Sequence, residues 1–236
     1  MKAQAAFVIH SRPYRETSQL VEIFTQEQGR QSVIAKGSRQ PRSPLKGLLQ
    51  PFVPLSLTFG GKGELKTLFK VEATAPAIRL VSTALYSGLY LNELIYYLLE
   101  AHTPFDEVFE AYQSTLQKLA AGDRLEPCLR HFEFYMLSVL GYGVDFTVDA
   151  QSGEDVEANA WYQYQPESGF SRLPKCEPGA YAGAHLYALS ELDFSTAEVL
   201  LTAKHFSRQA LAPYLGGRPL RSRALFIKGK RGSCSE

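Results

Sequence analysis

Four basic side chains fall within a twelve-residue segment that contains no acid. The segment is KGSRQPRSPLKG, residues 36–47, and its cations are Lys36, Arg39, Arg42 and Lys46. Its two glycines and two prolines are typical of an exposed loop, where we expect the cations to lack intramolecular partners. Lysine and arginine on such a loop neutralise phosphates and release counterions without contacting base edges. The segment therefore predicts a surface that binds a phosphate backbone.

Further cations extend this basic region and form a second one near the C-terminus. Arg30 precedes the loop, and Lys62, Lys66 and Lys70 lie in or after the turn at residues 60–63. The C-terminal segment contains Arg218, Arg221 and Arg223, followed by Lys228, Lys230 and Arg231. A basic tail of this kind is typical of nucleic-acid binding, and equally of a disordered chain end.

Three aromatic residues near the cations are candidates for stacking against unpaired bases: Tyr14, Phe52 and Phe59. Phe59 also continues an apolar stripe, so core packing is its alternative role.

The distribution of charge separates the ends of the chain from its middle. The net charge is +1, but residues 1–80 hold 12 basic and 5 acidic residues, residues 81–215 hold 7 and 18, and residues 216–236 hold 6 and 1. Segregation of this kind points to nucleic-acid surfaces at the two basic ends. We expect the acidic middle to avoid DNA and to bind proteins.

Basic residues within the acidic middle are scarce, which draws attention to Arg130, Lys204 and Arg208. Lys204 and Arg208 are four residues apart and share a helix face. They are candidates for binding the carboxylates of an acidic partner peptide. Intramolecular pairing with Glu133 or Glu198 is the alternative.

The sequence carries no pattern that requires an enzyme. The five histidines have no metal-ligand spacing, no GxSxG turn is present, and Cys128, Cys176 and Cys234 form no CxxC pair. A metal-independent hydrolase remains an alternative without a nucleophile–base pair to support it. The N-terminus lacks a signal-peptide pattern and the most apolar stretch is too short to cross a bilayer, so we expect a cytoplasmic protein.

Residues 1–80 predict a small β-barrel and the remainder predicts helices. Strands are expected at residues 5–11, 18–25, 31–36, 52–59 and 65–73, and five short antiparallel strands suggest an OB barrel. Pro54 places the fourth strand at an edge or a bulge. The fold class is thus multi-domain α+β, with an OB-fold domain at 1–80 and an α-helical domain at 81–236.

Within the helical domain, four helices and an irregular insert are expected. One begins near Ser82, a second has Thr103 as its N-cap and ends at Gly122, a third spans residues 126–140, and a fourth opens at Ser195 and ends before Pro213. The insert at about 144–181 is rich in Gly, Pro and Asp, with one strand at residues 161–165. The basic C-terminal tail occupies about 216–236.

Long segments of the chain resemble the bacterial RecO family of recombination mediators. They include AFVIHSRPYRETSQLVEIFTQEQGR, VIAKGSRQPRSPLKGLLQPFVPL, LRHFEFYMLSVLGYGVDF and ALAPYLGGRPLRSRALF. The resemblance implies an OB domain, a helical bundle, and binding of single- and double-stranded DNA with annealing of complementary strands. It also implies work with RecR to load RecA onto DNA coated by single-stranded-DNA-binding protein, whose acidic C-terminal tail would be bound. By resemblance, Lys36, Arg39, Arg42 and Lys46 carry DNA binding.

The insert departs from the zinc-binding form that the resemblance implies for many relatives. Where those relatives place a first CxxC, this chain has Asp149, Ala150, Gln151 and Ser152, and near the second it retains only Cys176. We therefore expect no zinc and no other cofactor, with the insert held by packing around Trp161, Tyr162 and Phe170. An OB-fold adaptor that binds structured RNA is the alternative to a DNA-binding mediator.

Overall fold

The computed structural model describes residues 2–232, and side chains as far as residue 226. Cys234 and the side chains of Lys228, Lys230 and Arg231 lie outside the described part. Two compact units are present: residues 1–125 with 219–236, called here the barrel unit, and residues 126–218, called here the insert unit. The first unit extends past residue 80 because the helices that follow the barrel pack against it, and the domain boundary at residue 80 stays a prediction.

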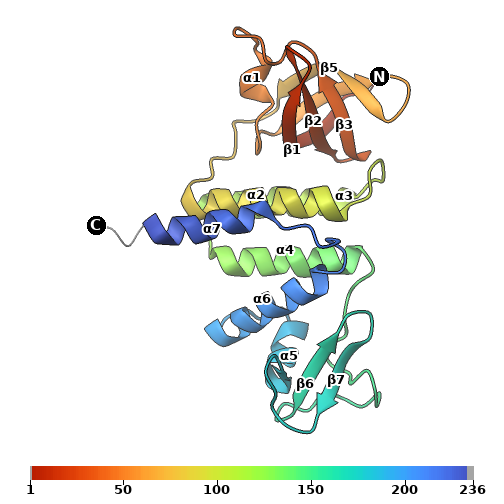
Figure 1. Cartoon of the computed structure of the whole chain (residues 1–236), viewed down its shortest axis with the longest axis vertical. Coiled ribbons are helices and arrows are strands. Elements are labelled where there is room, and N and C mark those ends of the chain that lie inside the picture. The colour runs from red at the N-terminus through yellow and green to blue at the C-terminus, as the bar shows by residue number, and fades with distance from the viewer. Residues whose placement is uncertain (1, 233–236) are drawn as a thin grey trace. The chain divides into compact units, whose positions relative to one another are not determined.

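Five strands close into a barrel, which confirms the predicted OB-type architecture (Figure 1). The strands, joined in the order β1-β2-β3-β5-β4, are β1 (Gln4–Tyr14), β2 (Ser18–Thr25), β3 (Gly29–Ala35), β4 (Leu55–Gly60) and β5 (Leu65–Ala73). The pairing of β3 with β5 is parallel and the other pairings are antiparallel. The short helix α1 (Leu45–Leu48) lies between β3 and β4.

The fourth strand begins three residues later than the pattern predicts. Phe52 has a φ of 66°, outside the strand region, and Pro54 has no N–H to donate to a ladder. Phe52 is also buried, so its proposed stacking role is wrong.

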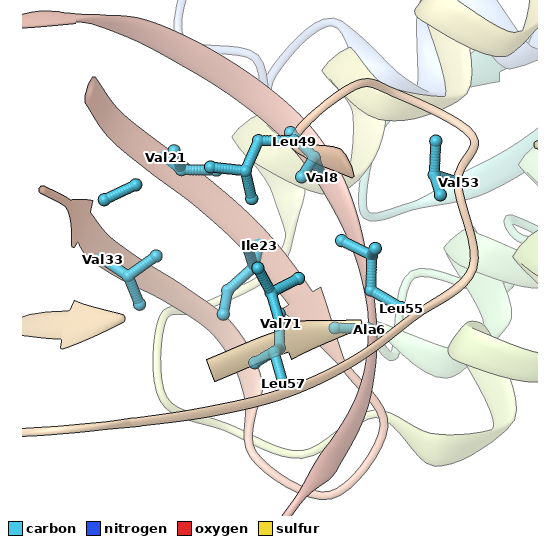
Figure 2. Close-up of a cluster of buried hydrophobic side chains, with 11 residues drawn as sticks. Ala6, Val8, Val21, Ile23, Val33, Leu49, Val53, Leu55, Leu57 and Val71 are labelled. Atoms are coloured by element: carbon cyan, nitrogen blue, oxygen red, sulfur yellow. The ribbon is translucent and has the colours of Figure 1, made fainter. Parts of the chain in front are cut away.

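Alternating apolar residues from all five strands fill the barrel (Figure 2). They are joined by Leu49 and Val53 from the connection before β4, and the buried set is Ala6, Val8, Val21, Ile23, Val33, Ala35, Leu49, Val53, Leu55, Leu57 and Val71. Leu45, Leu48 and Phe59 pack against the cluster from its margin, so Phe59 serves the core, as its apolar stripe suggested. Helix α1 thereby anchors the end of the basic loop to the barrel.

The outer face of β1 and β2 is covered by helices α2 (Ser82–Leu98) and α3 (Asp106–Ala121). Phe7 and Phe24 are paired across the strands, and their rings lie 5.6 and 5.4 Å from the ring of Phe109. Tyr112 contacts the same two rings and donates a 2.6 Å hydrogen bond to the Asn92 side chain. This aromatic cluster covers the outer face of β1 and β2 around Phe7 and Phe24 and joins the helices to the barrel, while residues 10–13 of β1 remain exposed.

Helix α3 begins later than Thr103, the predicted N-cap. Its cap position is Phe105, and the Thr103 hydroxyl donates to Glu100 instead. The backbone before the helix is held by β3, because the His102 N–H donates to the Arg30 carbonyl and the Thr103 carbonyl lies against Gly29. The predicted end at Gly122 is confirmed, with a left-handed φ of 85°.

The insert unit contains more regular structure than the sequence suggested. Its elements are α4 (Leu125–Val139, whose first residue falls in the barrel unit), β6 (Trp161–Gln165), β7 (Gly169–Leu173), β8 (Tyr181–Ala182), α5 (Gly183–Ser190) and α6 (Ala197–Leu211). Strand β6 is confirmed, whereas β7, β8 and α5 were not predicted, because their short sequences carry little periodicity. Helix α6 is capped by Thr196, one residue after the predicted Ser195. Tyr162 and Phe170 are core residues as predicted, but Trp161 is 37% exposed.

The C-terminal segment is helical where a basic tail was expected. Helix α7 (Arg221–Gly232) lies along α2 (Figure 1), and the ring of Phe226 contacts that of Tyr86. The Glu93 carboxylate accepts hydrogen bonds from the N–H groups of Arg221 and Ser222, both at 2.9 Å, and from the Ser222 hydroxyl. A carboxylate at this point satisfies the free N–H groups of the helix and its positive dipole end.

Removing this cap is expected to loosen α7. Glu93→Ala should lower the free energy of unfolding by about 1 kcal/mol, as loss of an N-cap does, and speed hydrogen exchange in residues 221–226. Glu110→Ala, at an exposed position of α3, is the control. Equal exchange rates in the two variants would contradict the capping role.

Candidate nucleic-acid interface

The basic loop, residues 36–47, follows β3 and ends within α1, and its first part is a series of tight turns. Gly37 adopts a φ of 68°, and the buried Ser38 hydroxyl donates to the Ala35 carbonyl. The N–H of Gln40 then donates to the carbonyl of Gly37, and that of Ser43 donates to the carbonyl of Gln40. Because the backbone is fixed in this way, the loop presents its cations from a defined scaffold.

All four loop cations are exposed, and within residues 2–232 none of them forms an ion pair. Arg39 donates only to neutral groups, the carbonyls of Arg15 and Glu16 at 3.1 and 3.2 Å, so it keeps its charge available. Lys36, Arg42 and Lys46 surround it along the loop. A group of uncompensated cations on an ordered loop can neutralise several phosphates.

The β1–β2 turn adds a cation that the sequence analysis did not assign to the surface. The Arg39 N–H donates to the Thr17 carbonyl, which joins this turn to the basic loop. Arg15 is exposed in the turn and its guanidinium lies 5.2 Å from the Tyr14 ring centroid. Its position beside the loop depends on contacts between segments more than twenty residues apart, which no local pattern reveals.

Arg30 has internal partners and is left out of the candidate surface. Its guanidinium pairs with the buried Glu22 at 3.3 Å, donates to the Leu99 carbonyl, and lies 5.0 Å from the Tyr96 ring centroid. These contacts attach β3 to α2. The side chain therefore helps to hold the helix on the barrel.

Lys62 lies in the turn before β5, and Lys66 lies at the start of β5, level with Val33 of β3. The turn between β4 and β5 precedes β5, which runs parallel to β3, so this turn lies beside the start of β3. The basic loop follows the end of β3. The Lys66 ammonium donates to the Gly61 carbonyl within its own turn, and Lys62 is exposed there.

The three C-terminal arginines belong to different compact units. Arg218 belongs to the insert unit, whereas Arg221 and Arg223 belong to the first turns of α7 in the barrel unit. Arg218 and Arg221 are exposed and Arg223 is partly buried.

The three cations assigned to a partner peptide differ in their accessibility. Arg130 is buried and pairs with the buried Glu133 at 2.9 Å, so its direct contact with a peptide would require rearrangement. Lys204 forms a 2.7 Å ion pair with Glu126, a partner other than the expected Glu133 or Glu198. Arg208 is exposed on the same face of α6. Desolvation opposes ionisation of Glu126, but Lys204, Arg130 and Arg208 together lower its pKa.

Comparison with known proteins decides the family. The model of the N-terminal part of recombination protein O matches residues 1–77, and the model of its C-terminal part matches residues 79–224. The DNA repair protein RecO of Actinobacillus succinogenes is 50% identical over 223 residues, 94% of each chain. That of Enterobacter sp. (strain 638) is 51% identical over 224 residues, 94% of this chain and 95% of the relative. The chain belongs to the RecO family.

Membership of the RecO family indicates a role in DNA repair and recombination. These RecO relatives are named as DNA repair proteins, and their names mention no catalytic activity. No helix among the described residues is long and apolar enough to span a membrane.

A single carboxylate organises the segment in which this RecO chain lacks the first CxxC pair. Asp149 is buried, and its carboxylate accepts from the N–H groups of Gln151, Ser152 and Arg172 at 2.8, 3.0 and 2.9 Å. It thus connects its own loop to β7. The described residues contain no group of three or more His, Cys, Asp or Glu placed to hold a metal.

Replacement of Asp149 is expected to destabilise the insert. Asp149→Ala leaves three N–H groups without their acceptor, which costs about 1–3 kcal/mol. Asp149→Asn should cost less, because its carbonyl oxygen can still accept from the loop. The fluorescence of Trp161, the only tryptophan in the chain and a residue of β6, can follow unfolding in urea.

The effect should depend on pH with a definite sign. Desolvation raises the pKa of Asp149, but the three backbone hydrogen bonds and Arg172 outweigh it and hold the pKa below the ordinary 3.8. The carboxylate therefore stabilises the fold fully above about pH 4, and this stabilisation is lost as the pH falls through the lowered value. The difference between wild type and Asp149→Ala should shrink in acid, and a constant difference would contradict this role. Asp155→Ala, at an exposed position, is the control.

Proposed function

We propose that this chain is a non-enzymatic, DNA-binding recombination mediator whose basic loop binds the phosphate backbone. The observation that carries the proposal is the group of exposed, uncompensated cations, Lys36, Arg39, Arg42 and Lys46, on an ordered loop of an OB-type barrel. Such a surface binds both single- and double-stranded DNA, because phosphates are common to both. Arg15 extends it.

Annealing follows from the same electrostatics. Two complementary strands repel each other through their phosphates, and a cationic surface that holds both lowers this repulsion. The same surface serves the loading of RecA, with RecR, onto DNA coated by single-stranded-DNA-binding protein.

The insert unit is the proposed site of protein recruitment. It holds twelve acidic against six basic residues, which disfavours DNA. On the insert unit, Lys204 and Arg208 form an accessible cationic site that can bind the acidic tail of single-stranded-DNA-binding protein. In the absence of peptide, Glu126 occupies Lys204, so the incoming carboxylates compete with an internal one.

The loop assignment is tested by the triple variant Arg39→Ala, Arg42→Ala, Lys46→Ala. Affinity for single-stranded DNA should fall, and the slope of log K against log salt should flatten by about 2, since each phosphate contact contributes about 0.7. The matched control removes three exposed cations elsewhere: Lys118, Arg124 and Lys175 to Ala. An unchanged slope in the loop variant would exclude the loop as the binding surface.

The same titration, carried out with RNA oligonucleotides of the same sequence, measures the affinity for RNA. Preference for RNA over DNA of the same sequence would favour the adaptor function instead.

The recruitment proposal predicts opposite effects for two variants, measured by fluorescence anisotropy with a labelled tail peptide. Lys204→Ala with Arg208→Ala should weaken binding about tenfold, because two charge-assisted contacts are lost. Glu126→Gln should strengthen it, because Lys204 then lacks its internal partner. DNA affinity should change little in either variant. If Glu126→Gln weakens peptide binding, the competition is refuted, and unchanged affinity in the double variant excludes this spot.

A further inference from the structure

Phe69 of β5 is an exposed aromatic side chain that is not part of the barrel core. It is 57% exposed, whereas its neighbours Leu68 and Val71 pack against the barrel core. Single exposed apolar side chains are common on protein surfaces. Among the exposed aromatic side chains of the described residues, however, Phe69 has the largest exposed fraction.

A β-bulge places the ring outside. Thr58 pairs with Lys70 and Phe59 pairs with Leu68, so Phe69 has no partner on β4. Val71 points inward, and strict alternation would direct Phe69 inward as well. The extra residue reverses the alternation, so Leu68 takes the inner position and Phe69 remains outside. Bulges often direct a side chain in this way near functional sites.

Phe69 belongs to β5, the strand that pairs with β3, and the basic loop continues from the end of β3. Strand β3 pairs in parallel with β5 from Ser32 with Leu65 to Ile34 with Thr67. Two residues beyond this last pair lie Phe69 on β5 and Lys36, the first residue of the basic loop. Helix α1, which contains Lys46, also contacts β5. The carboxylates on and before this strand are Glu72, which pairs with Lys70 at 2.8 Å, and Glu64 in the turn.

We propose that Phe69 stacks against an unpaired base of DNA whose phosphates are held by the basic loop. This inference rests on the proposed function, and it adds a contact that only single-stranded DNA can make, because bases in a duplex are stacked on one another. Stacking on an aromatic ring is independent of sequence, since every base has a π face. The barrel therefore binds single strands more tightly than duplex through this residue.

The test compares an oligothymidine with an abasic oligonucleotide of the same length, using the full chain. Phe69→Ala should weaken binding to oligothymidine about tenfold, within the usual effect of losing one stacked base. Binding to the abasic probe should not change, nor should the salt dependence, because no cation is removed. Phe69→Trp should restore the affinity. Leu65→Ala, at an exposed apolar position of the same strand, is the control.

The outcomes separate this inference from the function on which it rests. Equal loss on both probes would show a structural role, and no loss on either would exclude stacking, while the loop variant would still lose affinity for both. If the wild-type chain binds neither probe, the proposed function itself is wrong.

Discussion

The attachment of helices α2 and α3 to the outer face of β1 and β2 determines which part of the barrel can meet a ligand. Phe7 and Phe24 face Phe109 and Tyr112 across this contact, and burial raises the pKa of Tyr112, which stays neutral and donates to Asn92. The strand residues under this contact have no exposed surface, whereas residues 10–13 of β1 remain exposed. The exposed part of the barrel includes the end of β1, the β1–β2 turn, the basic loop and β5, and it carries exposed cations and Phe69.

Several carboxylates stabilise the fold by binding an arginine or backbone N–H groups within the chain. Glu22 pairs with Arg30 where β3 meets α2, Glu93 caps α7, and Asp149 binds three N–H groups in the insert. Each offsets its desolvation with hydrogen bonds or an opposite charge. The basic loop is different because its cations have no carboxylate partner in the described residues. A cation without an internal carboxylate partner remains available to an anionic ligand.

Charge is also divided between the two compact units. The barrel unit carries the basic loop, while acidic residues outnumber basic ones two to one in the insert unit. Under the proposed function, opposite potentials on separate units would let one chain bind DNA and a protein partner without competition between them. Near-neutrality of the whole chain is therefore compatible with DNA binding.

Local sequence determined the five barrel strands, the long helices and the basic loop, because alternation, helical periodicity and turn residues act over a few positions. It also determined the family, through segments spread along nearly the whole chain. Tertiary structure alone decided that Arg30 is engaged internally, that Arg15 joins the loop, and that the C-terminal segment docks as a helix on α2. It likewise decided that Phe69 lies outside, since a bulge depends on the register with a neighbouring strand. These outcomes depend on which distant groups meet, and the pattern of a single segment does not contain that information.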